Sequence, residues 1–280
     1  MNKYYKYIFV SIIILCSFYF TNQTAIIRRN NDPILQVIKD YSNTYNIEPI
    51  NAKIEDKYII PGMYGKRINE VKSLMKMKSD GVFNSLFLIY DDIKPDISLN
   101  NNKDKIIKKG NSNKKAISFI LENDESNIIT YLVSNKINAS LLINKNTINS
   151  NPYFEQINND FNNYNEVEKL LNKSKLNTNI CLLNRNNKEL CIKNNKYLIE
   201  PTYILNSNNL INIKNKITSG DIILIKDNVS IEDLDYLINY IKSKGINIIK
   251  LSDLIKEKDW LFISLFNFHN YRYNHRSSTS

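Results

Sequence analysis

The side chains best suited to chemistry are carboxylates that follow two apolar runs. Glu122, Asp124 and Glu125 come just after an apolar run at residues 116–121, and Asp227 comes after a second run later in the chain. Carboxylates alone can hold a hard divalent cation, so these four residues are candidates for a metal-binding or acid–base site. The alternative is that all four are hydrated loop residues, because no histidine lies near them in the sequence.

Strand-like and helix-like runs alternate around these carboxylates. Residues 116–121 and 139–143 are apolar runs bounded by polar residues, and a helical stretch separates them, which predicts the start of a βαβ unit. A further strand at residues 220–225 precedes an amphipathic helix at residues 230–244 and another strand at residues 246–251. Alternation of this kind predicts a mostly parallel sheet covered by helices.

The stretch between these two units has a weaker pattern. Residues 150–216 are dense in Asn, and the runs at residues 167–171, 180–183 and 197–205 are its candidate elements. From the first predicted strand to the last helical turn the chain has about 140 residues, whereas a complete eight-fold barrel takes ~250. The sequence therefore argues against a closed, regular barrel.

Three segments resemble a known family. Residues 114–147 and 220–254 are similar to the opening and closing units of the polysaccharide deacetylase (NodB-homology) family. The extension at residues 47–113 resembles that of a membrane-anchored subgroup found in spore-forming bacteria; its shared motifs are Asn51-Ala52-Lys53-Ile54, Pro61-Gly62 and Gly110-Asn111. The resemblance implies an α/β fold, an incomplete or distorted (β/α) barrel of the glycoside hydrolase/deacetylase type at residues 114–258, preceded by an anchor helix and a small α+β extension.

The same resemblance implies a reaction whose residues are missing from this sequence. Family members hydrolyse N- or O-acetyl groups on sugars with a divalent metal held by one aspartate and two histidines, beside an aspartate base; three ligands leave a position for water. The aspartate pair corresponds to Ile120 and Leu121, and the histidine of the last motif corresponds to Lys226, which Asp227 follows. The remaining motif falls within residues 144–164, which contain no histidine.

These losses lead to two functional hypotheses. The first is a catalytically degenerate, deacetylase-like cell-surface protein that needs no cofactor and binds cell-wall glycan or a partner in envelope or spore assembly. The alternative is a divergent metal-dependent carbohydrate deacetylase, a hydrolase of the amide bond in acetylated sugars, in which Zn²⁺ or a similar ion is held by other carboxylates such as Glu122, Asp124 and Glu125.

The amino terminus is typical of a membrane anchor. A short basic lead precedes an apolar run at residues 7–20, and extension to residue 27 gives the ~20 residues that a spanning helix needs. No convincing small-x-small cleavage site follows, which favours an uncleaved anchor at residues 1–27 over a secreted chain. A linker and helix are expected at residues 28–46. Basic residues flank both ends of the run, so the single-pass, outward-facing topology rests on the resemblance.

Cys181 and Cys191 are the only cysteines beyond the anchor. They lie on either side of Asn186, within residues 179–192, a segment that the sequence predicts to be a β-hairpin. An exported domain permits a disulfide between them, and the alternative is two unpaired thiols. Two cysteines with no nearby histidine do not make a zinc site.

The charge and the carboxyl-terminal tail carry less information. The net charge of +10 suits anionic partners, but the lysines are dispersed, and A/T-rich codons explain the abundance of Lys, Asn and Ile equally well. No helix-turn-helix, RNP-like or glycine-rich phosphate motif is present, so no nucleic-acid partner is expected.

The tail at residues 259–280 is aromatic and basic. It is expected to pack on the domain, and a membrane interface or a glycan groove are the alternatives. His269 and His275 are expected to lie in its solvated end.

Overall fold

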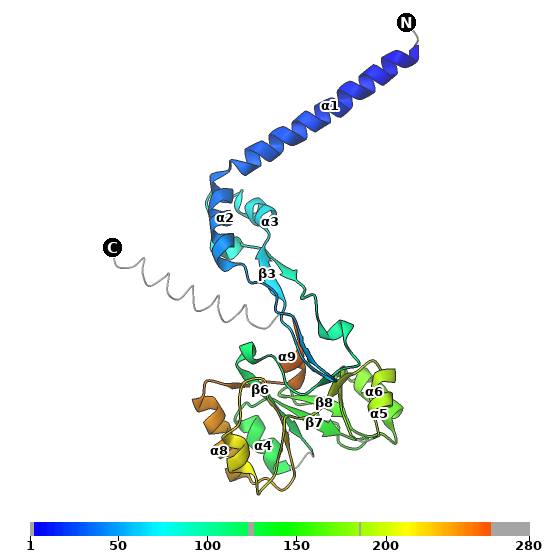
Figure 1. Cartoon of the computed structure of the whole chain (residues 1–280), viewed down its shortest axis with the longest axis vertical. Coiled ribbons are helices and arrows are strands. Elements are labelled where there is room, and N and C mark those ends of the chain that lie inside the picture. Colours follow the sequence, from blue (N-terminus) through cyan, green and yellow to red (C-terminus); the bar gives the residue numbers. More distant parts are fainter. Residues whose placement is uncertain (1–2, 123–125, 185, 259–280) are drawn as a thin grey trace, which may run out of the picture. The chain divides into compact units, whose positions relative to one another are not determined.

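The computed structural model of the chain describes residues 3–122, 126–184 and 186–258 (Figure 1). The chain divides into two compact units, and both are discontinuous in sequence. Unit 1 consists of Met1–Pro49 with Gly65–Ile93, and unit 2 consists of Ile50–Tyr64 with Lys94–Ser280. This division differs from the predicted boundary between an extension at residues 47–113 and a domain at residues 114–258, because the segments at 50–64 and 94–113 fold with the residues that follow them.

Unit 1 contains three helices and an antiparallel strand pair. They are α1 (Lys3–Asn30), α2 (Pro33–Tyr45), β3 (Gly65–Ile68), α3 (Glu70–Met77), the 3-10 turn η1 (Ser85–Phe87) and β4 (Tyr90–Ile93). Asp32 caps α2 by accepting a hydrogen bond from the N–H of Ile34, and Pro33 occupies the first turn, where it is best tolerated. α2 and α3 bury Leu35, Ile38 and Met77 in a common core.

The first helix is unlike the other two helices of unit 1. From Tyr7 to Asn30 it is long and apolar enough to cross a membrane, a property that signal sequences near an amino terminus share, and none of that stretch is buried. It is the one such helix in the described part of the chain.

Unit 2 contains two sheets whose strands are mostly parallel. The larger sheet has the order β11-β12-β6-β7-β8, with β13 also paired to β6, and every pair in it is parallel. Its strands are β6 (Ala116–Leu121), β7 (Ala139–Ile143), β8 (Phe154–Asn158), β11 (Tyr203–Leu205), β12 (Ile222–Ile225) and β13 (Asn247–Ile248). The second sheet has the order β1-β2-β5-β10-β9, in which only β1 and β2 are antiparallel. Its strands are β1 (Lys53–Glu55), β2 (Tyr58–Ile60), β5 (Ile106–Ile107), β9 (Ile180–Leu182) and β10 (Tyr197–Ile199).

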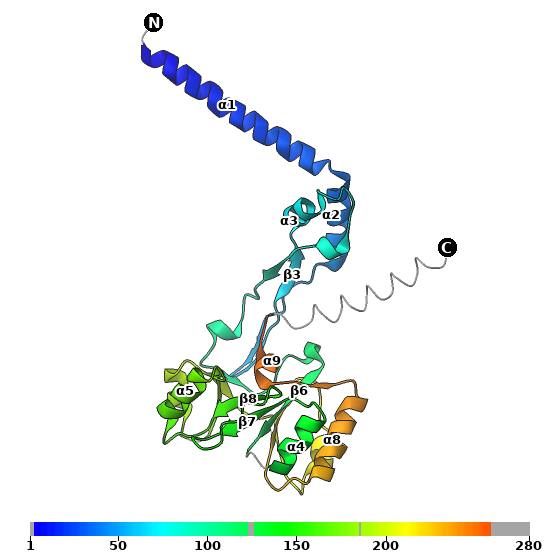
Figure 2. The ribbon, with the colours of Figure 1, turned by 180° about the vertical axis from the view of Figure 1, so that it is seen from behind.

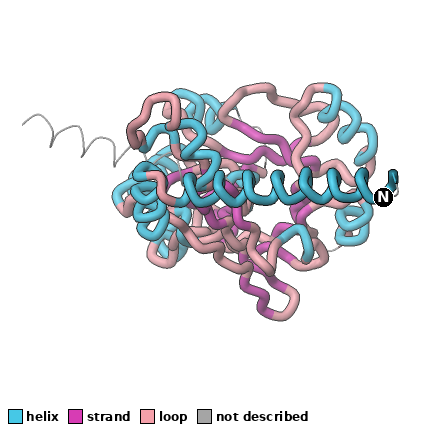
Figure 3. The backbone as a smooth tube through the Cα atoms, turned by 90° about the horizontal axis from the view of Figure 1, so that it is seen from above, coloured by secondary structure: helices cyan, strands magenta, loops and turns pink. Residues whose placement is uncertain are grey.

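Two hydrophobic layers follow from the alternation of side chains along the strands. One layer packs residues of both sheets against each other, with one residue from each of six strands: Ile120, Leu142, Ile157, Ile180, Ile199 and Leu224. The other layer packs the opposite face of the larger sheet against helices; it includes Phe119 and Leu121, whose neighbour Ile120 faces the first layer. The helices of unit 2 are α4 (Ser126–Ser134), α5 (Tyr164–Lys173), α6 (Lys188–Lys193), α7 (Leu210–Lys214), α8 (Ile231–Ser243) and α9 (Leu251–Ile255). Two of them, α4 and α8, lie together beside β6 (Figure 2), and helices and loops lie around most of the strands (Figure 3).

The two sheets resemble a barrel that is not closed. β10 and β11 are separated only by residues 200–202, yet they belong to different sheets. Pro201 lies between them and has no N–H to donate to a strand ladder, so the single run expected at residues 197–205 is divided there. The described strands thus form the incomplete barrel that the sequence predicts.

Helix α9 is held at both ends near the start of the parallel strands. The carboxylate of Glu155 accepts a hydrogen bond from the N–H of Ser252 (3.0 Å) at the amino end of the helix, and the hydroxyl of Ser140 donates to that carboxylate (2.6 Å). At the other end the ammonium of Lys114 donates to the carbonyl of Asp253 (2.6 Å) and to that of Lys256. An acid at the amino end and a cation at the carboxyl end both match the helix dipole. Burial lowers the pKa of Lys114 to about 8.

Candidate functional site at the carboxyl ends of the strands

A lysine and a glutamate meet where the first and last long strands of the larger sheet end. β6 and β12 are parallel neighbours, with Leu121 opposite Ile225, so Glu122 and Lys226 leave the sheet side by side. The N–H of Glu122 donates to the carbonyl of Ile225 (3.2 Å), which fixes the start of the loop. The ammonium of Lys226 forms an ion pair with the carboxylate of Glu122. About a third of each side chain is exposed, at 38% and 31%.

The two positions that the resemblance aligns with the family's aspartate pair lie in the apolar layers. Ile120 is fully buried between the two sheets, and Leu121 is buried on the opposite face, against the helices. Alternation along β6 therefore sends these side chains to opposite faces of the sheet, and neither carries an atom that can bind a metal.

Of the other three candidate carboxylates, the structure describes Asp227 alone. Asp227 lies exposed in the loop that follows Lys226. Asp124 and Glu125 lie outside the described residues, as does the tail at residues 259–280 with His269 and His275. The residues that the structure describes contain no group of three or more His, Cys, Asp or Glu side chains arranged to hold a metal ion. Among the described residues, the charge that faces Glu122 is the ammonium of Lys226.

A cleft opens beside Glu122, and sequence reasoning missed most of its lining. It has a volume of about 590 Å³ and lies between the loops that follow β7 and β8. Its lining from those loops comprises Asn144, Lys145, Asn146, Thr147, Asn159, Asp160, Phe161, Asn162 and Asn163. The sequence does not predict β8, because three of its five buried residues, Glu155, Gln156 and Asn158, are polar. A strand of this composition has no apolar pattern for sequence reasoning to detect.

Local hydrogen bonds hold the two loops in shape. The side-chain oxygen of Asn144 accepts from the N–H of Asn146 (2.9 Å), and the hydroxyl of Thr147 accepts from the N–H of Asn144 (2.9 Å). In the second loop the carboxylate of Asp160 accepts from the N–H of Asn163 (3.0 Å), and this contact holds the pKa of that exposed carboxyl below its usual range. Such Asx turns are the reason that Asn and Asp are common in tight loops. The cleft therefore presents side-chain amides, the ring of Phe161, the carboxylates of Glu122 and Asp160, and the ammonium of Lys145.

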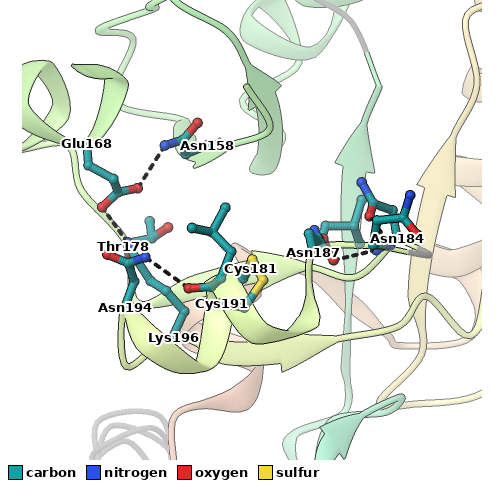
Figure 4. The surroundings of a disulfide bond; sticks show 12 residues. Asn158, Glu168, Thr178, Cys181, Asn184, Asn187, Cys191, Asn194 and Lys196 are labelled. Carbon is teal, nitrogen blue, oxygen red and sulfur yellow. Dashed lines mark hydrogen bonds and ion pairs between the residues drawn. A yellow bond between two sulfur atoms is a disulfide. The ribbon is translucent and has the colours of Figure 1, made fainter. Parts of the chain in front are cut away.

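A disulfide joins Cys181 of the second sheet to Cys191 of a helix (Figure 4), with their Cα atoms 5.9 Å apart. The prediction of a hairpin here is wrong, because Cys181 lies on β9 and Cys191 on the helix α6. The turn between them is built by Asn187, whose amide donates to the carbonyl of Leu182 (2.8 Å) and accepts from the N–H of Asn184 (2.9 Å). Asparagine side chains thus direct the chain into a helix where the sequence pattern indicates a second strand.

A second buried contact supports the same part of unit 2. Lys196 forms an ion pair with Glu168 (2.8 Å) and donates to the carbonyl of Thr178 (2.5 Å), and Glu168 also accepts from the amide of Asn158 (3.1 Å; Figure 4). This contact joins α5 to the segments that flank β8, β9 and β10. Every group in it has a partner, so its role is structural.

Comparison of the sequence with known proteins gives a partial match. No family model matches the sequence. The uncharacterized protein YlxY of Bacillus subtilis (strain 168) is 26% identical over 134 residues, which are 46% of this chain and 42% of that protein, so the match spans less than half the length of this relative.

Two solved structures resemble the chain over most of its length. BA3943, described as a CE4 family pseudoenzyme from Bacillus anthracis, has a TM-score of 0.57 and 17% identity over 81% of this chain and 96% of its own. A BA3943 mutant, described as having restored enzymatic activity, has a TM-score of 0.55 and 17% identity over 81% of this chain and 99% of its own. At these identities the likeness establishes the fold. The predicted α/β fold with parallel sheets is confirmed, and so is the resemblance to the polysaccharide deacetylases at the level of the fold.

Proposed function

We propose that this chain, which has the fold of a CE4 deacetylase, is a membrane-anchored surface protein that has lost the hydrolytic reaction and binds a saccharide in the cleft beside Glu122. One observation carries the proposal. The ion pair between Glu122 and Lys226 lies at the ends of β6 and β12, where the family places its metal motifs. A deacetylase needs a cation there with an open coordination position for water.

The ion pair opposes a divalent cation in two ways. The ammonium of Lys226 neutralises Glu122, and its positive charge repels a second cation nearby. The two preceding positions on β6 are apolar and buried, so no described side chain replaces the missing aspartates there. BA3943, whose fold this chain shares, is described as a pseudoenzyme, which supports the same interpretation.

The cleft has side chains that suit a neutral sugar. Amides donate and accept hydrogen bonds at once, as sugar hydroxyl and acetamido groups require, and the cleft presents those of Asn146, Asn159 and Asn162. The half-buried ring of Phe161 offers an apolar face for the carbon side of a sugar ring. We therefore name an N-acetylated oligosaccharide of the cell wall as the ligand.

The proposed location follows from the anchor and the disulfide. α1 crosses the membrane once and stays attached, and unit 2 lies outside the cell, where an oxidising environment stabilises the bond between Cys181 and Cys191. In this location the chain meets cell-wall glycan or envelope proteins, and nucleic acid is absent.

The test is a binding titration with the full chain in neutral detergent. N-acetylglucosamine oligomers and peptidoglycan fragments are the probes, each with and without added Zn²⁺. We expect binding that does not need metal, and about fivefold weaker binding for Phe161→Ala, because one aromatic contact contributes ~1 kcal/mol. Tyr236→Ala is the matched control, since Tyr236 is an exposed aromatic residue on α8 that does not line the cleft. Failure of every glycan to bind, or equal losses in both variants, would refute the glycan proposal; capture of an envelope protein by the same chain would favour the partner role instead.

The second candidate function is the divergent metal-dependent deacetylase. One observation favours it: Glu122 and Asp160 line the same cleft, so two carboxylates face one space. This function predicts that the purified chain contains a stoichiometric divalent metal and releases acetate from acetylated oligosaccharides, and that a chelator and Glu122→Gln abolish that release. Our proposal predicts no acetate release under these conditions.

A further inference from the structure

A groove in unit 1 lies between the carboxyl-terminal turns of α1 and the helix α3. Its volume is about 770 Å³. Ala25 and Ile26 of α1 and Leu74 and Met75 of α3 form apolar parts of its lining. Met75 is 69% exposed, so it presents apolar surface at the groove.

Three cations line the same groove. Arg28 and Arg29 come from the last turn of α1, and Lys78 comes from the end of α3. None of the three takes part in an ion pair within the described residues. Asp32 also lines the groove; its carboxylate caps α2 by accepting the N–H of Ile34 and keeps its charge, so three positive charges face one negative charge there. The groove is therefore apolar along one part and cationic at the end that lies next to α2.

The length of α1 places this cationic end at a definite depth in a bilayer. A helix rises 1.5 Å per residue, so the stretch from Tyr7 to Ile27 spans roughly 30 Å, the thickness of the hydrocarbon core. Arg28 and Arg29 then lie at the level of the lipid headgroups. Only residues 31 and 32 separate α1 from α2, a reach of at most ~7 Å, so unit 1 stays against the membrane surface.

We propose that this groove binds an anionic phospholipid. Arg28, Arg29 and Lys78 hold the phosphate group, and the acyl chains pack on Ile26 and Met75. The proposal rests on the membrane crossing of α1 that is part of the proposed function. An amphipathic ligand of this kind matches both parts of the lining. Its charged head lies at the level of the cations, and its acyl tails lie at the level of the apolar side chains.

The experiment is native mass spectrometry of the full chain in neutral detergent, titrated with phosphatidylglycerol or phosphatidylcholine. We expect one phosphatidylglycerol to be retained in preference to phosphatidylcholine. Lys78→Gln should weaken retention about fivefold, the effect of one cation near an anionic lipid, and the triple variant Arg28→Gln, Arg29→Gln and Lys78→Gln should remove the preference. Glycerol 3-phosphate should not compete, because it lacks acyl chains.

Lys76→Gln is the matched control, since it removes one lysine from the same helix at a position that does not line the groove. Equal loss in Lys76→Gln and Lys78→Gln, or unchanged preference in the triple variant, would overturn the lipid site. Release of the wild-type chain from membranes by alkaline carbonate would overturn the anchor itself, and with it the site. If carbonate leaves the chain in the membrane but lipid preference is absent, the lipid site alone fails, and glycan binding at the cleft is judged by its own titration.

Discussion

The parallel strands of unit 2 carry a lysine at each end, and the two lysines are held in different ways. Lys114, just before β6, is 1% exposed, and its ammonium binds carbonyl oxygens at the end of α9. Lys226, just after β12, is 38% exposed in its side chain and pairs with the carboxylate of Glu122. In barrels of this kind the amino end of the strands serves stability and the carboxyl end serves function. The contacts of Lys114 stabilise the fold, whereas those of Lys226 lie where a reaction would occur.

The largest expected effect is the loss of Lys114. Lys114→Ala removes three buried methylene groups, worth ~0.8 kcal/mol each, and leaves two part-buried carbonyl oxygens without this donor, at ~1 kcal/mol each. Relief of a buried charge offsets part of this, so we expect the free energy of unfolding to fall by about 3 kcal/mol. Urea denaturation of the full chain in detergent measures it. Lys242→Ala, an exposed lysine on α8, is the control and should change stability by less than ~0.5 kcal/mol. A small effect of Lys114→Ala would mean that the amino end does not depend on this contact.

The pH dependence of stability tests whether Lys114 is truly desolvated. Its pKa falls from 10.5 to about 8 in the folded chain, and burial is the largest cause. Between pH 8 and pH 10.5 the unfolded chain therefore binds one more proton than the folded chain, and stability rises with pH in this window. Relative to Lys114→Met, which does not titrate at this position, the wild type should gain up to about 3 kcal/mol across the window. Denaturation at pH 7.5, 9 and 10.5 measures the difference in the free energy of unfolding between the two proteins. A difference that does not change with pH would show that the ammonium of Lys114 is hydrated in the folded chain.

Where the sequence pattern is local, the structure follows it closely. The predicted strands at residues 116–121 and 139–143 have the same bounds as β6 and β7, because unbroken apolar runs between polar residues mark a buried parallel strand. α2, from Pro33 to Tyr45, lies within the linker and helix expected at residues 28–46, and its proline occupies the first turn.

Where a partner comes from a distant segment, the sequence is not sufficient. β8 buries Glu155 and Gln156, whose partners include Ser140 and Asn149 on neighbouring segments, and no local pattern shows that such polar residues are satisfied. The candidate site likewise depends on a contact between distant segments. The motif comparison identifies Lys226 as a substituted position, but its pairing with Glu122, 104 residues away, depends on β6 and β12 being parallel neighbours in one register. The loops of the cleft were missed because asparagine-rich segments give no periodic signal.

The smallest expected effect is the loss of the ion pair at the carboxyl end. Each partner is about one third exposed, and pairs of this kind contribute ~0–1 kcal/mol because water competes for both charges. In a double-mutant cycle with Glu122→Gln and Lys226→Met, measured by urea denaturation, we expect a coupling energy below ~1 kcal/mol. A coupling energy of 2 kcal/mol or more would show that this end also serves stability, and the contrast with Lys114 would not hold. A small coupling energy would mean that stability alone does not explain why a lysine and a glutamate lie together where the family holds a metal. The remaining explanation for the pair would then be its role in the chemistry of the cleft.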